Sequence, residues 1–149
     1  MDTAFAGQTL ADLLEQPEGQ QLAFVRGKFR PEDLAETLAA LANAQGGTVV
    51  VGSGGRGRGK GRAVEHPSEG LGDLDAARDA ALDAALLCTP PLVIPLPAVA
   101  RHGEVSLLLI SIPPGLPHVY SVHGKYLRRE GPADQPIPPA ALRKLLLER

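Results

Sequence analysis

A cationic, glycine-rich stretch is the clearest candidate for chemistry in this chain. Residues 53–62 read SGGRGRGKGR, so that Arg56, Arg58, Lys60 and Arg62 follow one another with no acidic residue between them. An arginine can hold a phosphate through two parallel hydrogen bonds, and the glycines between the cations let the backbone approach closely. Such contacts bind a phosphate backbone without reading base sequence. The stretch therefore predicts a binding site for a polyanion.

The same stretch resembles a nucleotide-binding loop without completing one. Residues 54–60 fit the spacing Gly-x4-Gly-Lys and follow an apolar segment. The next residue, however, is Gly61, so the hydroxyl that would ligate magnesium is missing. Residues 62–67 do not read as a helix, so no helix N-terminus is available to hold phosphates. Nucleotide binding is therefore disfavoured relative to nucleic-acid binding.

Two further groups of basic residues are Lys125, Arg128 and Arg129, and Arg26, Lys28 and Arg30. Strand alternation would put Lys125 and Arg129 on one side of a hairpin and Arg128 on the other. One side could extend a phosphate-binding surface. Arg128 could instead pair with a buried carboxylate or a helix end, and the sequence leaves both roles open. The group Arg26, Lys28 and Arg30 is more typical of a solvated face.

Composition limits the other classes of function. The chain has 149 residues, of which 44% are hydrophobic and 3% aromatic, and its formal net charge is −2. This length and composition fit one globular domain spanning residues 1–149. A slightly acidic chain does not attract nucleic acid over its whole surface, so binding must depend on a local patch. With few aromatic residues, a base-stacking platform is not expected.

No cofactor or metal is expected. The four histidines lack metal-ligand spacing, and Cys88 lies in an apolar run typical of a buried structural thiol. The N-terminus does not read as a signal peptide. No stretch has the length of about 18 apolar residues that marks a candidate membrane span. We therefore expect a cytoplasmic, prokaryotic protein with no membrane partner.

The surrounding elements predict how the basic stretch is positioned. Pro31 and the acids that follow it open a helix that ends at Asn43, which is expected to satisfy backbone groups at the helix end. Gly46–Gly47 then turns the chain sharply into a strand at 48–51. Residues 53–72 read as a long loop. Helices are also predicted near 10–16, over 73–87 and from 138, and strands over 20–26, 92–100, 104–112, 119–122 and 125–129.

This order predicts an α+β domain with a mixed, largely antiparallel sheet flanked by helices. In the closing helix, Leu142, Leu145 and Leu146 have the spacing of an inner, core-facing side. Tight turns are predicted at residues 101–103 and at His123–Gly124.

Several motifs together resemble the Schlafen-type AlbA-like domain. They are the helix-to-strand unit over 34–52 with its Asn-x-x-Gly-Gly turn, the segment 115–119 followed by GKYLRREG at 124–131, and a closing leucine-rich helix. The likeness covers about residues 18–149. It implies the fold of that family and a DNA-binding role, often in prokaryotic transcription regulation.

The resemblance also implies that most of the family's nuclease residues are missing from this chain. Family members with nuclease activity resemble one another in three acidic positions, which would hold a divalent metal that activates water. Glu18 matches the first of these positions, but Ala23 and the stretch 53–55 occupy the other two, and Val25 replaces a usual lysine. We therefore expect a binding protein rather than an enzyme.

We interpret the chain as a nucleic-acid-binding protein, with DNA favoured over RNA. Arg56, Arg58, Lys60 and Arg62 are its main phosphate contacts, Lys125, Arg128 and Arg129 are additional ones, and a homodimer could present two such loops to one duplex. Two alternatives stay open. One is a metal-dependent nuclease that recruits acids from elsewhere in the chain, and the other is a protein-interaction module without nucleic-acid contacts.

Overall fold

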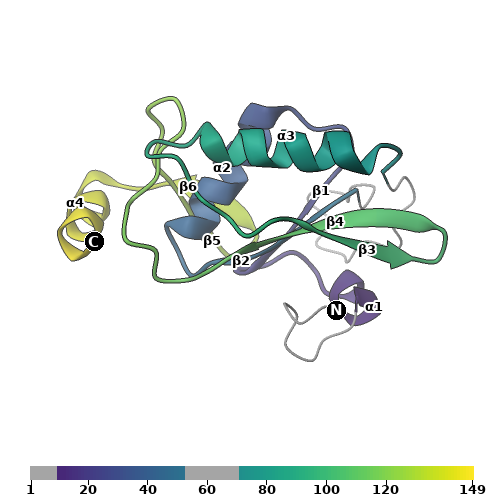
Figure 1. The fold of residues 1–149 in the computed structure, drawn as a ribbon. Coiled ribbons are helices and arrows are strands. Elements are labelled where there is room, and N and C mark those ends of the chain that lie inside the picture. Colours follow the sequence, from purple (N-terminus) through teal and green to yellow (C-terminus); the bar gives the residue numbers. More distant parts are fainter. Residues whose placement is uncertain (1–9, 53–70) are drawn as a thin grey trace.

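The computed structural model describes residues 10–52 and 71–149, which form helices and strands in the predicted order (Figure 1). The elements are α1 (Leu10–Glu15), β1 (Leu22–Val25), α2 (Pro31–Ala42), β2 (Gly47–Val51), α3 (Leu74–Leu86), β3 (Ala98–His102), β4 (Val105–Ile112), β5 (Leu127–Glu130), β6 (Ala133–Pro136) and α4 (Pro139–Glu148). This confirms the α+β fold class.

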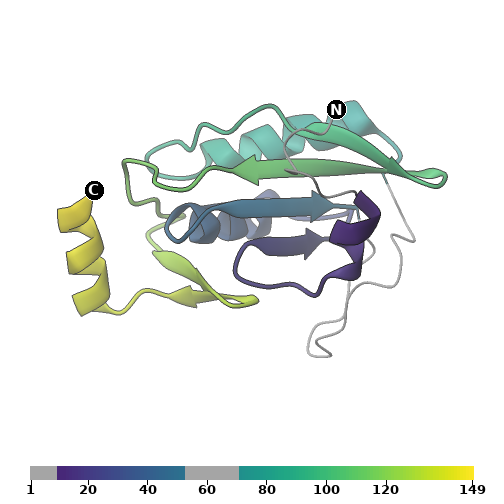
Figure 2. The ribbon, with the colours of Figure 1, turned by 90° about the horizontal axis from the view of Figure 1, so that it is seen from below.

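The main sheet contains four strands in the order β1-β2-β4-β3. β1 pairs in parallel with β2, placing Phe24 opposite Val50, and β4 pairs antiparallel with both β2 and β3. The sheet is therefore mixed and largely antiparallel, as predicted. Since β1 and β2 are parallel, their carboxyl ends lie on the same side of the sheet. We call this side the carboxyl edge of β1 and β2, as distinct from the outer strands of the sheet, and Figure 2 shows that it faces away from α4.

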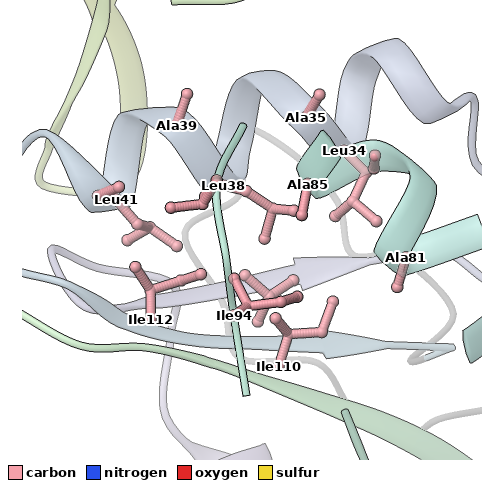
Figure 3. Close-up of a cluster of buried hydrophobic side chains, with 14 of the residues drawn as sticks. Leu34, Ala35, Leu38, Ala39, Leu41, Ala81, Ala85, Ile94, Ile110 and Ile112 are labelled. Carbon is pink, nitrogen blue, oxygen red and sulfur yellow. The ribbon is translucent and has the colours of Figure 1, made fainter. Parts of the chain in front are cut away.

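Helices α2 and α3 cover one face of the sheet and enclose the larger core (Figure 3). Leu34, Leu38 and Leu41 of α2 have at most 1% of their surface exposed. A fully buried leucine contributes about 1.5–3 kcal/mol, so this row alone holds α2 on the sheet. In α3 the buried residues are all alanines, Ala81, Ala84 and Ala85, whose small side chains let α3 lie close to α2.

The short helix α1 covers part of the opposite face. Leu13 and Leu14 are 4% exposed and pack with Leu22, Val50 and Leu109 in a second, smaller core. The two cores lie on opposite faces because successive side chains of a strand alternate between faces. In β2, for example, Val49 and Val51 belong to the larger core and Val50 to the smaller one.

The turn between α2 and β2 depends on two glycines, as predicted. The Gly46 N–H donates to the Leu41 carbonyl at 2.8 Å, which ends the helix. Gly46 and Gly47 have φ angles of 75° and 147°, which favour glycine. A side chain at Gly46 would collide with the Ile112 carbonyl, and one at Gly47 would lie 2.5 Å from the Gln21 carbonyl oxygen. The turn therefore lies directly against the end of β4 and the residue that precedes β1.

The strands after β4 differ from their predicted positions. Strands were expected over 119–122 and 125–129, but residues 119–126 form only isolated bridges around the His123–Gly124 turn. Ser121 exchanges backbone hydrogen bonds with Thr89, and the Asn43 side chain makes hydrogen bonds with both the N–H and the C=O of Tyr120. These groups are therefore unavailable for a strand ladder, and the hairpin forms later, between β5 and β6.

Two other predictions were wrong, one of a strand boundary and one of the burial of a helix. The strand expected over 92–100 begins at Ala98, because Pro91, Pro95 and Pro97 cannot donate backbone hydrogen bonds to a neighbouring strand. No residue of α4 is buried, and Leu146, expected on the inner side, is 53% exposed. Helix α4 lies at the end of the molecule (Figure 1), so its leucine spacing predicted a helix correctly but not the partner for that helix.

Among the described residues, no helix has both the length and the apolar character that crossing a membrane requires.

Candidate nucleic-acid interface

The principal predicted site, Arg56, Arg58, Lys60 and Arg62, lies outside the described residues. The residues that flank it are described and lie close to one another. The Gly52 N–H donates to the Val25 carbonyl at 2.7 Å, and the Leu71 N–H donates to the Ser106 carbonyl at 3.0 Å. A Cβ atom added to Gly52 would lie 3.0 Å from the Leu71 side chain. The two flanking residues, Gly52 and Leu71, therefore lie together at the carboxyl edge of β1 and β2.

The third basic group lies at this same edge. Residues 26–30 follow β1 directly, and Val25, which accepts the hydrogen bond from Gly52, immediately precedes them. Arg26, Lys28 and Arg30 are all exposed. Arg30 pairs with Asp33 at 3.5 Å, but both side chains are more than 60% exposed, so this pair restrains the arginine only weakly. Parallel pairing of β1 with β2 thus places residues 26–30 beside Gly52, the residue that precedes the other cationic stretch in the sequence.

The sequence alone offered one signal for this arrangement. A basic run that directly follows a predicted strand will lie at the carboxyl edge of that strand. The sequence did not show that β1 and β2 are parallel neighbours, which places residues 26–30 beside Gly52. Arg26, Lys28 and Arg30 are exposed, as expected of a solvated face, and they also adjoin the flanks of residues 53–62.

The second basic group is not brought together as one surface. Lys125 forms an ion pair with Glu36, and Arg128 pairs with Glu130 at 3.0 Å. Lys125 precedes β5 rather than lying within it, so the expected strand alternation does not relate it to Arg129. In both pairs an acid offsets the cation, so these two side chains offer little net positive charge to a phosphate.

Arg129 lies in the interior, with only 4% of its surface exposed. Its guanidinium donates from Nε to the Gly19 carbonyl at 3.0 Å, from Nη2 to the Leu22 carbonyl at 2.9 Å, and from Nη1 to the Asp134 carboxylate at 2.9 Å. Every nitrogen of the guanidinium therefore has a protein partner. Arg128 pairs with the exposed Glu130, whereas the buried pairing that was considered for it is made by Arg129 with the largely buried Asp134. Arg129 thus ties β5 to β1 and is not presented to solvent.

Asn43 has the helix-end role that the sequence predicted, and a wider one. It is 2% exposed and caps the C-terminus of α2. Its amide Nδ2 donates to the Tyr120 and Leu127 carbonyls at 2.8 and 2.9 Å, and its Oδ1 accepts from the Tyr120 N–H at 2.8 Å. One side chain therefore joins the end of α2 to two later segments.

The positions that match the nuclease pattern have structural contacts. The Glu18 carboxylate accepts from the Phe24 N–H at 2.8 Å. Ala23, at the second acidic position, is 2% exposed in the larger core, and the third position falls outside the described residues. Within residues 10–52 and 71–149, no three His, Cys, Asp or Glu residues gather in a way that could hold a metal ion.

Cys88 is buried, as the sequence predicted, and we expect its thiol to be unreactive. It is 2% exposed, and burial raises its pKa to about 11. Because the thiolate is the reactive form, a disulfide reagent at pH 8 should modify folded protein far more slowly than protein unfolded in urea. Equal rates of modification in the folded and unfolded protein would contradict the burial of this thiol.

The pKa of the Cys88 thiol is higher in the folded protein than in the unfolded chain. The free energy of unfolding should therefore fall as the pH rises from about 8.5 toward 11.

Comparison with known proteins agrees with the fold and the motifs. The family described as Schlafen, AlbA_2 matches residues 18–138. No curated protein matches the chain. The N-terminal domain of a RecG-related protein from Nitrosomonas europaea is similar, with a TM-score of 0.60 and 25% identity over 86% of this chain and 92% of that one.

A second solved structure, the DIP2311 protein from Corynebacterium diphtheriae, shares the fold, with a TM-score of 0.56 and 17% identity. The match covers 93% of this chain but only 24% of that protein, in which the fold forms one part of a longer chain. The family match extends over most of the sequence and includes the Asn-x-x-Gly-Gly turn, β5 and β6. The chain therefore belongs to the Schlafen AlbA_2 family.

Proposed function

We propose that this protein binds nucleic acid through phosphate contacts at the carboxyl edge of β1 and β2, with DNA as the expected partner and without catalysis. The observation that supports the proposal is that residues 26–30 and the two flanks of the cationic stretch 53–62 lie together at that edge. Residues 26–30 leave β1 there, and the flanks of the stretch containing Arg56, Arg58, Lys60 and Arg62, Gly52 and Leu71, adjoin them.

Charge explains why a local site is needed. The whole chain carries a formal charge of −2, so attraction to phosphates must come from a region in which cations outnumber acids. Residues 26–30 contain three cations and no acid, and residues 53–62 contain four cations and no acid. Phosphate contacts of this kind bind without sequence preference and weaken steeply with salt.

Family membership and one structural neighbour support a role connected with nucleic acid. The neighbour from Nitrosomonas europaea is described as related to an ATP-dependent DNA helicase, and its domain matches this chain over most of both lengths. This favours DNA as the partner. Glu18 and Ala23 favour binding over cleavage, because the acid is engaged with the backbone and the alanine supplies no ligand.

Salt-dependent binding provides the test. We expect the protein to bind duplex DNA with a log–log salt slope that falls by about 0.9 for each phosphate contact removed. Replacing Arg56, Arg58, Lys60 and Arg62 by alanine, or Lys28 and Arg30 by alanine, should lower both the affinity and the slope. Fluorescence anisotropy with duplex DNA, single-stranded DNA and RNA over a range of salt concentrations measures both quantities and the preference among the three.

A matched control separates a site from a general charge effect. The double change Arg143→Ala and Lys144→Ala removes the same charge as Lys28→Ala and Arg30→Ala, from exposed side chains of α4 at the far end of the sheet (Figure 2). It should leave the slope unchanged. Equal effects of the two double variants, or no binding at low salt, would overturn the proposal, and magnesium-dependent cleavage of any probe would establish the nuclease alternative.

A further inference from the structure

The two outer strands of the main sheet, β1 and β3, differ in whether other parts of the chain cover their outer sides. At the β1 edge, the carbonyls of Gly19 and Leu22 accept hydrogen bonds from the Arg129 guanidinium, and Gln20 donates to the Arg129 carbonyl at 2.7 Å. The segment containing β5 therefore protects this edge. Strand β3 forms the other edge.

Strand β3 has an unpaired side. It pairs with β4 from Ala98 opposite Leu109 to His102 opposite Val105. In an antiparallel pair, alternate residues direct their N–H and C=O groups away from the partner strand. Within the described part of the chain, no residue outside β4 makes a backbone hydrogen bond to β3. These outward groups are a template for one more strand.

Proline residues block strand pairing before β3 but not within it. Pro91, Pro95 and Pro97 prevent strand pairing along the preceding segment, whereas residues 98–102 contain no proline, lysine or acid, and Arg101 is their only arginine. Apolar side chains are exposed in β3 and in the segment that precedes it. Val93 is 80% exposed, Leu96 is 67% exposed, and Val99 of β3 itself is 40% exposed.

We propose that β3 is a homodimer interface, at which it pairs antiparallel with β3 of a second copy around a two-fold axis at Ala100. In this register Ala100 faces its own counterpart, Ala98 faces His102, and Val99 faces Arg101 of the second copy. No like charges lie opposite each other, and the stem of Arg101 can cover the exposed Val99 side chain. The two four-stranded sheets join into one, so that both open edges are satisfied.

A second copy fits this edge because the strand is complementary to itself. The register above uses the whole proline-free stretch, from Ala98 to His102, on both sides. The interface does not involve residues 26–30, so substitutions at Lys28 and Arg30 and substitutions at position 99 test the two proposals separately.

Charge substitutions at position 99 test the register itself. We expect sedimentation equilibrium of the wild-type protein to show a concentration-dependent dimer. Val99→Arg places an arginine opposite Arg101 of the second copy at both symmetry-related positions, and should raise the dimer dissociation constant about tenfold. Val99→Glu places a carboxylate opposite the same arginine and should leave the dimer intact or tighten it. Combining Val99→Arg with Arg101→Glu should restore the dimer.

A control addresses the other exposed apolar surface. Leu147 of α4 is 73% exposed, and Leu147→Arg makes the same kind of change away from β3. It should not alter the dissociation constant, and circular dichroism should show that all the variants are folded. A wild-type protein that is monomeric at every concentration would overturn the proposal, as would equal effects of the arginine and glutamate substitutions at position 99.

Discussion

Replacing Arg129 by methionine is expected to lower the free energy of unfolding by about 3–5 kcal/mol. The side chain lies between β1 and β5 with only 3% of its surface exposed. Methionine has no donors and ends near the position of Nε, so the change removes three hydrogen bonds and leaves the space of the guanidinium head unfilled. It leaves the Gly19 and Leu22 carbonyls without their side-chain donor and leaves Asp134 without a cation.

The loss should extend beyond the site because Asp134 is itself shared. Its second carboxylate oxygen accepts from the Thr37 hydroxyl at 2.9 Å, so the Arg129–Asp134 pair connects β1, the β5–β6 hairpin and α2. Arg129→Lys keeps the charge but not the planar fork, and one ammonium cannot reproduce three donors in fixed directions. We expect its stability to lie between that of Arg129→Met and that of the wild type.

Urea unfolding at neutral pH, followed by circular dichroism, measures these differences. The neighbouring Arg128 provides the control, because its ion pair with Glu130 is partly exposed and Arg128→Ala should cost less than about 1 kcal/mol. Adding Asp134→Asn to Arg129→Met should cost less than the sum of the single changes, since the two residues interact directly. Similar losses for Arg128→Ala and Arg129→Met would contradict the structural role assigned to Arg129.

The contrast between Arg128 and Arg129 shows where sequence reasoning fails. Both residues lie in one basic run, and alternation requires only that they face opposite sides. Which one faces inward depends on Gly19 and Leu22, more than a hundred positions earlier in the chain. The closing helix shows the same limit, because its leucine spacing predicts a helix whether or not another element covers it.

The elements that were predicted correctly are those determined by local chemistry. Pro31 and the acids after it start α2, Gly46 and Gly47 end it, and the β-branched residues that follow form β2. By contrast, β6 was not predicted and β5 begins two residues later than predicted, because their sequences show no alternation of polar and apolar residues and long-range contacts fix their position. The candidate site depends on both kinds of information, because its cations are visible in the sequence, whereas the meeting of residues 26–30 with the flanks of residues 53–62 requires parallel pairing of β1 and β2.

Asn43 is the residue for which one atom exchange should have the largest effect. Asn43→Asp is nearly isosteric, yet it replaces the amide that donates to the Tyr120 and Leu127 carbonyls by an oxygen that faces both of them. Two buried acceptors lose their donor, and a carboxylate is placed beside them at a position that is 2% exposed. With about 1–3 kcal/mol for each group left unsatisfied, we expect a loss of about 3–5 kcal/mol at pH 7.

The loss should depend on pH in a direction that the geometry fixes. Burial beside two carbonyl oxygens disfavours the charged form, so the pKa of the introduced carboxyl should be raised above its value in the unfolded chain, about 3.9. A raised folded-state pKa adds stability below the unfolded-state pKa, and this is lost as the pH rises through the folded-state value. Relative to the wild type, Asn43→Asp should therefore be least stable at neutral pH and recover partly in acid.

Gln45→Glu makes the same amide-to-acid change two residues away, on an exposed side chain. It should change stability by less than about 0.5 kcal/mol, as surface substitutions usually do. Urea unfolding of both variants across the acid and neutral range measures the difference. If the two variants lost the same stability, the amide of Asn43 would not be holding the end of α2 against Tyr120 and Leu127. If Asn43→Asp lost more stability in acid than at neutral pH, the buried carbonyls would not be what its side chain faces.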